Sequence, residues 1–122
     1  MPNINRSYNN VYGILFCNSS LKKPYKILRD RLGLTEAEVY LYKSQFDGAE
    51  SLKVRTDIYD LETDKTDRDS EYLLNGEVAG ETAEVITRIK EIADVLNLNN
   101  YRCHFEIYDD NSEFLDEYPK SQ

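Results

Sequence analysis

The sequence predicts one α+β domain in which an antiparallel sheet of four to five strands carries two helices on one face. Three observations support this. The 122 residues fit the usual size of a single domain, and no linker or repeat divides residues 1–122. Two segments have apolar residues at helical spacing, and strand-like segments precede, separate and follow them. A ferredoxin-like βαββαβ arrangement is our first choice, because it satisfies this order with few crossings.

The first third of the chain predicts a buried strand followed by a helix. Residues 11–17 are apolar and rich in strand-forming side chains. Residues 21–32 carry apolar side chains at helical spacing, and Pro24 is tolerated only if the helix begins close to it. Gly33 then predicts a left-handed helix end, with Leu34 closing over the last turn.

Residues 35–46 allow two interpretations. The capping-box spacing from Thr35 to Glu38 favours a helix, whereas the residues that follow are strand formers. We expect a strand from Glu38 to Phe46, because Asp47-Gly48 is a hairpin signal. The second strand of that hairpin is expected over residues 52–59, where apolar and polar side chains alternate.

The second half of the chain predicts a loop, a short strand, a helix and a last strand. Residues 62–70 contain no apolar side chain and are expected to form a loop. Residues 71–79 predict a short strand or a small hairpin that turns at Asn75-Gly76. An apolar stripe predicts a helix over residues 82–96. A strand is expected over residues 101–108, and residues 112–116 indicate a short terminal helix.

Acidic residues are concentrated in two segments. The chain has 23 acidic and 15 basic residues, for a net charge of -8. Residues 57–71 carry a net charge of -5 and residues 106–117 carry -6, so the rest of the chain has a charge of +3. Clustered like charges repel one another, at a cost to stability that scattered charges avoid. The two acidic segments are therefore candidate binding sites.

We expect these segments to bind a partner together with the tyrosines in and beside them. Tyrosine combines a large contact area with one polar end, which suits protein interfaces. In the first segment the candidate partner-binding residues are Asp57, Tyr59, Asp60, Glu62, Asp64, Asp67, Asp69, Glu71 and Tyr72. In the second they are Glu106, Tyr108, Asp109, Asp110, Glu113, Asp116 and Glu117.

The sequence does not indicate a catalytic or metal site. Cys17 and Cys103 are not a close pair, and we expect both to be buried, reduced thiols. Cys103 and the adjacent His104 would point to opposite faces of a strand, so they do not form a nucleophile pair. The run from Asp60 to Glu71 has the length of a calcium loop, but Lys65 stands where the sharp turn needs glycine. We expect no enzymatic activity and no cofactor.

Hydropathy and charge argue against two further classes. The longest apolar run, Ile14–Cys17, is far shorter than the roughly 20 residues of a membrane span. The first residues lack the apolar region of a signal peptide, so we expect a cytoplasmic protein. Most of an acidic surface repels nucleic acid, so direct nucleic-acid binding is not expected.

These features lead to two functional hypotheses. In size, acidity and lack of catalytic motifs the chain is similar to bacterial toxin-immunity proteins and phage-borne inhibitors. That likeness implies a small acidic protein that neutralises a basic protein, such as a nuclease-type toxin, by covering its cleft. The alternative is a small-molecule-binding or enzymatic ferredoxin-like dimer, in which Arg55, Tyr59, Arg102 and His104 line a pocket. Exposed strand edges make a homodimer compatible with either hypothesis.

Overall fold

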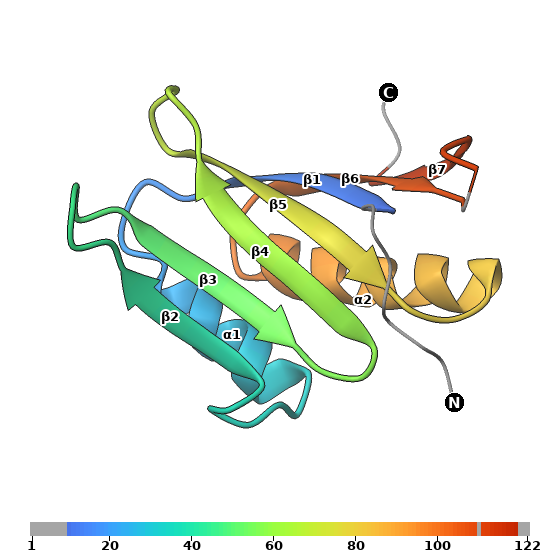
Figure 1. Cartoon of the computed structure of the whole chain (residues 1–122), viewed down its shortest axis with the longest axis horizontal. Helices are drawn as coiled ribbons and strands as arrows, with labels where there is room; N and C mark the ends of the chain where they lie inside the picture. Colours follow the sequence, from blue (N-terminus) through green and yellow to red (C-terminus); the bar gives the residue numbers. More distant parts are fainter. Residues whose placement is uncertain (1–9, 110, 120–122) are drawn as a thin grey trace.

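The computed structural model of the chain describes residues 10–109 and 111–119 (Figure 1). In these residues seven strands and two helices follow one another. The strands are β1 (Val11–Phe16), β2 (Val39–Lys43), β3 (Glu50–Arg55), β4 (Tyr59–Lys65), β5 (Glu71–Val78), β6 (Cys103–Tyr108) and β7 (Phe114–Tyr118). The helices are α1 (Lys22–Arg31) and α2 (Thr82–Leu98).

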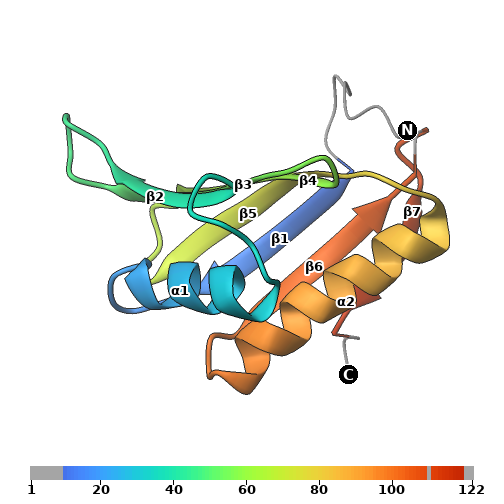
Figure 2. The ribbon, with the colours of Figure 1, turned by 90° about the horizontal axis from the view of Figure 1, so that it is seen from below.

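The seven strands form one antiparallel sheet in the order β2-β3-β4-β5-β1-β6-β7. Both helices lie on the same side of this sheet (Figure 2). The predicted α+β fold, with an antiparallel sheet and two helices, is therefore confirmed. The predicted number of four to five strands is wrong. The ferredoxin-like arrangement is not confirmed, because the sheet has seven strands.

A continuous core fills the space between the sheet and the helices. The side chains of Leu15, Phe105 and Ile107 from the central strands are at most 1% exposed, and Ile89 of α2 is fully buried. Gly13 lets the Phe105 ring lie against β1, because a Cβ at this position would come within 2.5 Å of the ring. Side chains alternate along each strand, so those between core positions point to the side without helices.

The first helix forms as predicted, and the strand after it forms inside the predicted range but is shorter at both ends. Gly33 has a φ of +68°, and the Leu34 N–H donates to the Arg29 carbonyl at 2.8 Å, which closes the end of α1. Residues 39–43 form β2, so the strand interpretation of this segment is confirmed. The capping-box spacing instead makes a turn, in which the Thr35 N–H donates to the Glu38 carboxylate at 3.0 Å.

Two predicted bounds are wrong. The strand expected over residues 52–59 ends at Arg55, and the loop expected over residues 62–70 begins only after Lys65. The chain turns at Thr56, whose hydroxyl oxygen accepts the backbone N–H groups of Ile58 and Tyr59, each at 3.0 Å. The turn separates β3 from β4, and β4 continues to Lys65. Thr63, a fully buried residue, occupies a core position that apolar content alone does not reveal.

Residues 71–79 form one strand and not a hairpin. Asn75-Gly76 lies inside β5, which pairs with β4 on one side and β1 on the other. Gly76 has a φ of +153°, and a Cβ there would come within 1.9 Å of the Asp60 carbonyl oxygen. Gly76 therefore permits a close approach of the β4 and β5 backbones, which is one reason for a glycine inside a strand.

The predicted terminal helix over residues 112–116 is also wrong. Residues 114–118 form β7, which pairs with β6. The turn before it is held by Asp109, whose carboxylate accepts the N–H groups of Asn111 at 2.8 Å and Glu113 at 2.9 Å. Ser112, with a φ of +62°, completes the reversal. The Tyr118 hydroxyl donates to Asp94 at 2.5 Å and ties β7 to α2.

Candidate binding face

The side of the sheet that the helices leave uncovered, called here the open face, carries much of both acidic segments. Asp60, Glu62 and Asp64 of β4 alternate with buried residues and point to this side. Glu106 and Tyr108 of β6 also alternate with buried residues and point to the open face. Only β5 and β1 lie between β4 and β6, so at about 4.8 Å per step these two acidic strands are about 14 Å apart. Folding therefore places acids from the two segments on one side of the sheet.

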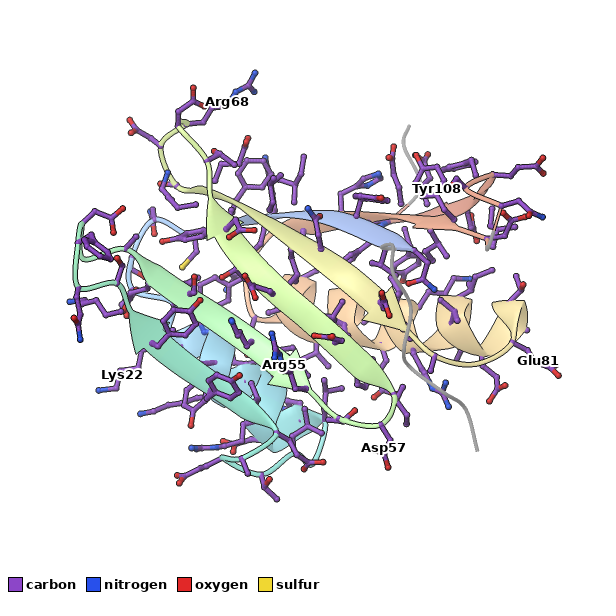
Figure 3. All side chains as sticks on the ribbon, in the orientation of Figure 1. Lys22, Arg55, Asp57, Arg68, Glu81 and Tyr108 are labelled. Atoms are coloured by element: carbon purple, nitrogen blue, oxygen red, sulfur yellow. The ribbon has the colours of Figure 1, made fainter. Side chains whose placement is uncertain are left out.

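The twist of the sheet divides the open face into two parts. Figure 1 shows β3 and β4 broadside and β1 and β6 nearly edge-on, whereas Figure 2 shows the reverse. Arg55 on β3 and Tyr108 at the end of β6 accordingly lie on well-separated parts of the surface (Figure 3). The open face therefore has two differently oriented parts, a β3–β4 part and a β1–β6–β7 part.

Charges in the β3–β4 part are compensated by the chain itself. Lys53 Nζ lies 3.1 Å from Glu62 Oε1. Arg55 lies 3.4 Å from Asp60 and 3.8 Å from Glu62. The hydrogen bond to Glu62 is the main cause of the raised pKa of Lys53. Asp60 and Glu62 thus already have cationic neighbours and have less to offer a basic partner.

The remaining acids of the first segment lie mostly at the ends of β4. Asp57 is exposed in the β3–β4 turn, and Asp67 and Asp69 are exposed in the β4–β5 loop; Figure 3 labels Asp57 and, in the same loop as the other two, Arg68. Asp64 is exposed near this loop. Glu71 begins β5, with an oxygen 4.0 Å from Arg68. These residues form a fringe around β4 and not one compact patch.

Two tyrosines of the first segment point away from the open face. Tyr59 and Tyr72 are each 8% exposed and belong to the core. Desolvation by burial is the main cause of the raised pKa of both phenols. The turn at Thr56 to Ile58 reverses the alternation that the sequence pattern assigns, and this turns Tyr59 inward. Both tyrosines therefore offer a partner little contact area.

Aromatic side chains gather in the β1–β6–β7 part. The rings of Tyr12 and Tyr108 meet edge to face, with centroids 5.5 Å apart and planes at 88°. The rings of Tyr108 and Phe114 meet in the same way at 5.8 Å and 78°. We call these three residues the aromatic cluster. Tyr12 is 43% exposed and Phe114 is 54% exposed, so the cluster presents a large apolar area to solvent.

A carboxylate lies beside this cluster. The Tyr108 hydroxyl donates to Glu106 Oε1 at 3.1 Å, and this hydrogen bond is the main cause of the raised pKa of Tyr108. Tyr12, Glu106, Tyr108 and Ser112 line a recess of about 410 Å³, which we call the aromatic recess. The recess is open to solvent and combines π faces, a carboxylate and hydroxyl groups.

The other residues of the second acidic segment have different surroundings. Glu113 is exposed beside the β6–β7 turn, and Asp109 is occupied in holding that turn. Glu117 pairs with Glu106 across β6 and β7, and its carboxylate lies 3.5 Å from His104. Asp116 is opposite Ile107 and therefore on the helix side. Asp110 lies outside the described residues.

Sequence reasoning missed four apolar residues of the open face. Tyr12, Ile14, Leu73 and Phe114 are between 36% and 54% exposed, and Ile14 and Leu73 are neighbours across β1 and β5. The alternation of buried and exposed residues in β1 could have identified Tyr12 and Ile14. The sequence does not show this alternation, because every residue of β1 apart from Gly13 is aliphatic or aromatic, on both faces of the strand.

The residues of the small-molecule hypothesis are dispersed. Arg55 lies against Asp60, Tyr59 is buried, and His104 lies against Glu117. Arg102 stacks on Phe16, with its guanidinium carbon 5.0 Å from the ring centroid. Arg55 in β3 and His104 in β6 are four strand steps apart, or about 19 Å. These four side chains do not converge on one pocket.

Both cysteines are free and buried. Burial raises the pKa of the Cys103 thiol to about 12. Within residues 10–109 and 111–119, no group of three or more His, Cys, Asp or Glu side chains could hold a metal ion. No helix in this part of the chain is long and apolar enough to cross a membrane.

Comparison of the chain with protein-family models, curated proteins and solved structures finds no match.

Proposed function

We propose that the protein binds a basic protein partner and neutralises it by occlusion, as toxin-immunity proteins and protein inhibitors do. The observation that carries this proposal is the pairing of exposed aromatic rings with carboxylates in the β1–β6–β7 part of the open face. Exposed apolar patches rimmed by polar residues mark interaction sites. Aromatic anchors slow release of a partner, and complementary charge speeds its arrival.

The distribution of charge supports one orientation of binding. Lys22, Lys23 and Lys26 are exposed on α1, which lies on the opposite side of the sheet from the open face (Figure 2). A basic partner is repelled by α1 and attracted by the acids of the open face. Glu106 and Glu113 flank the aromatic cluster, so the same surface supplies both attraction and apolar contact.

The alternative, a small-molecule-binding or enzymatic dimer, has less support. It needs a pocket in which apolar walls surround a few converging polar groups, whereas Arg55, Tyr59, Arg102 and His104 are spread over several strands. Homodimerisation remains a separate prediction, which a measurement of mass in solution decides.

The test uses two double variants with the same change in net charge. Glu106→Gln/Glu113→Gln removes two acids beside the aromatic cluster. Glu36→Gln/Glu91→Gln removes two exposed acids outside the open face, on the α1–β2 loop and on α2. Asp109, Glu81 and Glu84 are unsuitable for such sets, because Asp109 holds a turn and the other two form the capping box of α2.

The wild-type chain and both variants are immobilised and exposed to lysate of the source cell at low and high salt. We expect the wild-type and control chains to capture the same basic protein at low salt, and the Glu106→Gln/Glu113→Gln chain to lose it. The purified partner should lose its activity when the wild-type chain is added in equimolar amount. Recovery of only neutral or acidic proteins, or equal loss in both variants, contradicts the proposal.

A further inference from the structure

The aromatic recess combines aromatic rings with a carboxylate. Two tyrosine rings, of Tyr12 and Tyr108, stand at 88° to one another, and the Glu106 carboxylate adjoins them. The Tyr108 hydroxyl fixes Glu106 Oε1 at 3.1 Å. Among the described residues no donor is hydrogen-bonded to the second oxygen, Oε2. The recess therefore combines aromatic faces with a positioned carboxylate whose Oε2 can accept a further hydrogen bond.

Five other aromatic rings in the described part of the chain lie under the chain's own cations. Arg29 lies over Tyr25, and Arg102 lies over Phe16. Lysines lie over the rings of Tyr42, Tyr72 and Tyr118. In the described part of the chain no cation lies over Tyr12, Tyr108 or Phe114. The aromatic cluster is thus a set of rings beside a carboxylate to which the described chain brings no cation.

We propose that the aromatic recess binds an arginine side chain of the partner, an inference that rests on the proposed function. A guanidinium group is planar, stacks on aromatic faces and donates two N–H groups to one carboxylate. In the recess it stacks on the Tyr12 ring and donates to Glu106. Lysine carries a compact, strongly hydrated charge that suits such a site less well. The site therefore selects arginine over lysine at equal charge.

The probes are an acetylated, amidated tetra-arginine peptide and the corresponding tetra-lysine peptide. Binding is followed by nuclear magnetic resonance of the full chain at low salt. We expect the tetra-arginine peptide to shift resonances of Tyr12, Glu106 and Tyr108 and to bind several-fold more tightly than tetra-lysine. Equal affinity of the two peptides, or shifts confined to the fringe around β4, overturns the proposal.

Matched variants locate the effect. Tyr12→Leu and Tyr42→Leu each remove an exposed tyrosine of the open face, 43% and 41% exposed respectively. Tyr12→Leu should weaken tetra-arginine binding roughly 3- to 30-fold, the range that a cation–π contact gives. Tyr42→Leu should leave it unchanged, because Tyr42 already has Lys53 over its ring. Tyr12→Phe keeps a π face and should retain binding, which also shows that position 12 tolerates change. Equal effects of Tyr12→Leu and Tyr42→Leu contradict the arginine site.

The two proposals fail in distinguishable ways. Partner capture that depends on Glu106 and Glu113, without preference for tetra-arginine, leaves occlusion standing and rejects the arginine site. Arginine-selective binding in the recess, without inhibition of any basic partner, supports the arginine site and rejects occlusion.

Discussion

Thr63 joins β3 to β4 at the point where their regular ladder ends. Its hydroxyl oxygen accepts the Leu52 N–H at 2.9 Å, and both groups are buried. Thr63→Val keeps the shape and leaves that N–H without its acceptor, so we expect a loss of about 1–3 kcal/mol in the free energy of unfolding. Urea unfolding measures this change in the free energy of unfolding. Thr87→Val, on the exposed side of α2, is the control and should cost much less. Equal losses in both variants contradict this role of Thr63.

The Cys103 thiol should react only slowly with alkylating reagents in the folded chain. With the thiol pKa raised to about 12 by burial, roughly one thiol in ten thousand is ionised at pH 8. In a Cys17→Ser variant, iodoacetamide should therefore label Cys103 slowly at pH 8 and rapidly after unfolding. Stability should fall as pH rises above the ordinary thiol pKa of 9.0, because the unfolded thiol ionises first. Rapid labelling of the native chain would show that the thiol is accessible.

At the scale of elements, Glu50 joins the start of α1 to β3. Its carboxylate accepts the Leu21 N–H and the Ser20 hydroxyl, each at 2.8 Å. An acceptor at a helix N-terminus satisfies a donor that the helix leaves unpaired. Glu50→Ala should lower the free energy of unfolding by about 1–2 kcal/mol, and Glu50→Gln should lower it less, since the amide oxygen still accepts. Hydrogen exchange should speed up first in α1. Unchanged exchange in α1 contradicts this capping role.

The elements differ in how well the sequence predicts them, for physical reasons. α1 and α2 were predictable because each buries one apolar stripe, and Gly33 marks an end. β4 was not, since it buries Tyr59, Leu61 and Thr63 and exposes acids between them, so its composition resembles that of a loop. β7 was also missed, because it is an edge strand whose pairing with β6 depends on a turn held by Asp109, and neither feature has a strong local pattern.

The candidate site was predictable only in part. Its charge was visible in the sequence, and Glu106, Tyr108 and Glu113 lie in or beside the part of the open face that we propose as the binding surface. The direction of Tyr59 depends on the phase of a strand after a turn, which composition does not give. Tyr12 lies outside both acidic segments, and Phe114 lies within the second segment but carries no charge. Only the pairing of β1, β6 and β7 brings these two rings to Tyr108.

At the scale of the whole molecule, charge separation between the two sides should govern how a partner approaches. The lysines of α1 lie on the helix side, and the acids near the aromatic cluster lie on the open face. Fields of this kind change association rates more than they change the stability of a formed complex. Salt weakens them, because the screening length is about 8 Å at physiological ionic strength.

The variant Lys22→Gln/Lys23→Gln/Lys26→Gln should therefore associate with the basic partner faster than the wild-type chain. We expect an increase of roughly two- to ten-fold at low salt that disappears at high salt. The dissociation rate should not change, because α1 does not touch a partner bound to the open face. Glu106→Gln/Glu113→Gln should act in the opposite direction on association and should also speed dissociation, since these acids lie beside the contact. Stopped-flow or surface-based kinetics measure both rates. A change in dissociation rate on replacing the lysines would place α1 inside the interface and contradict binding through the open face.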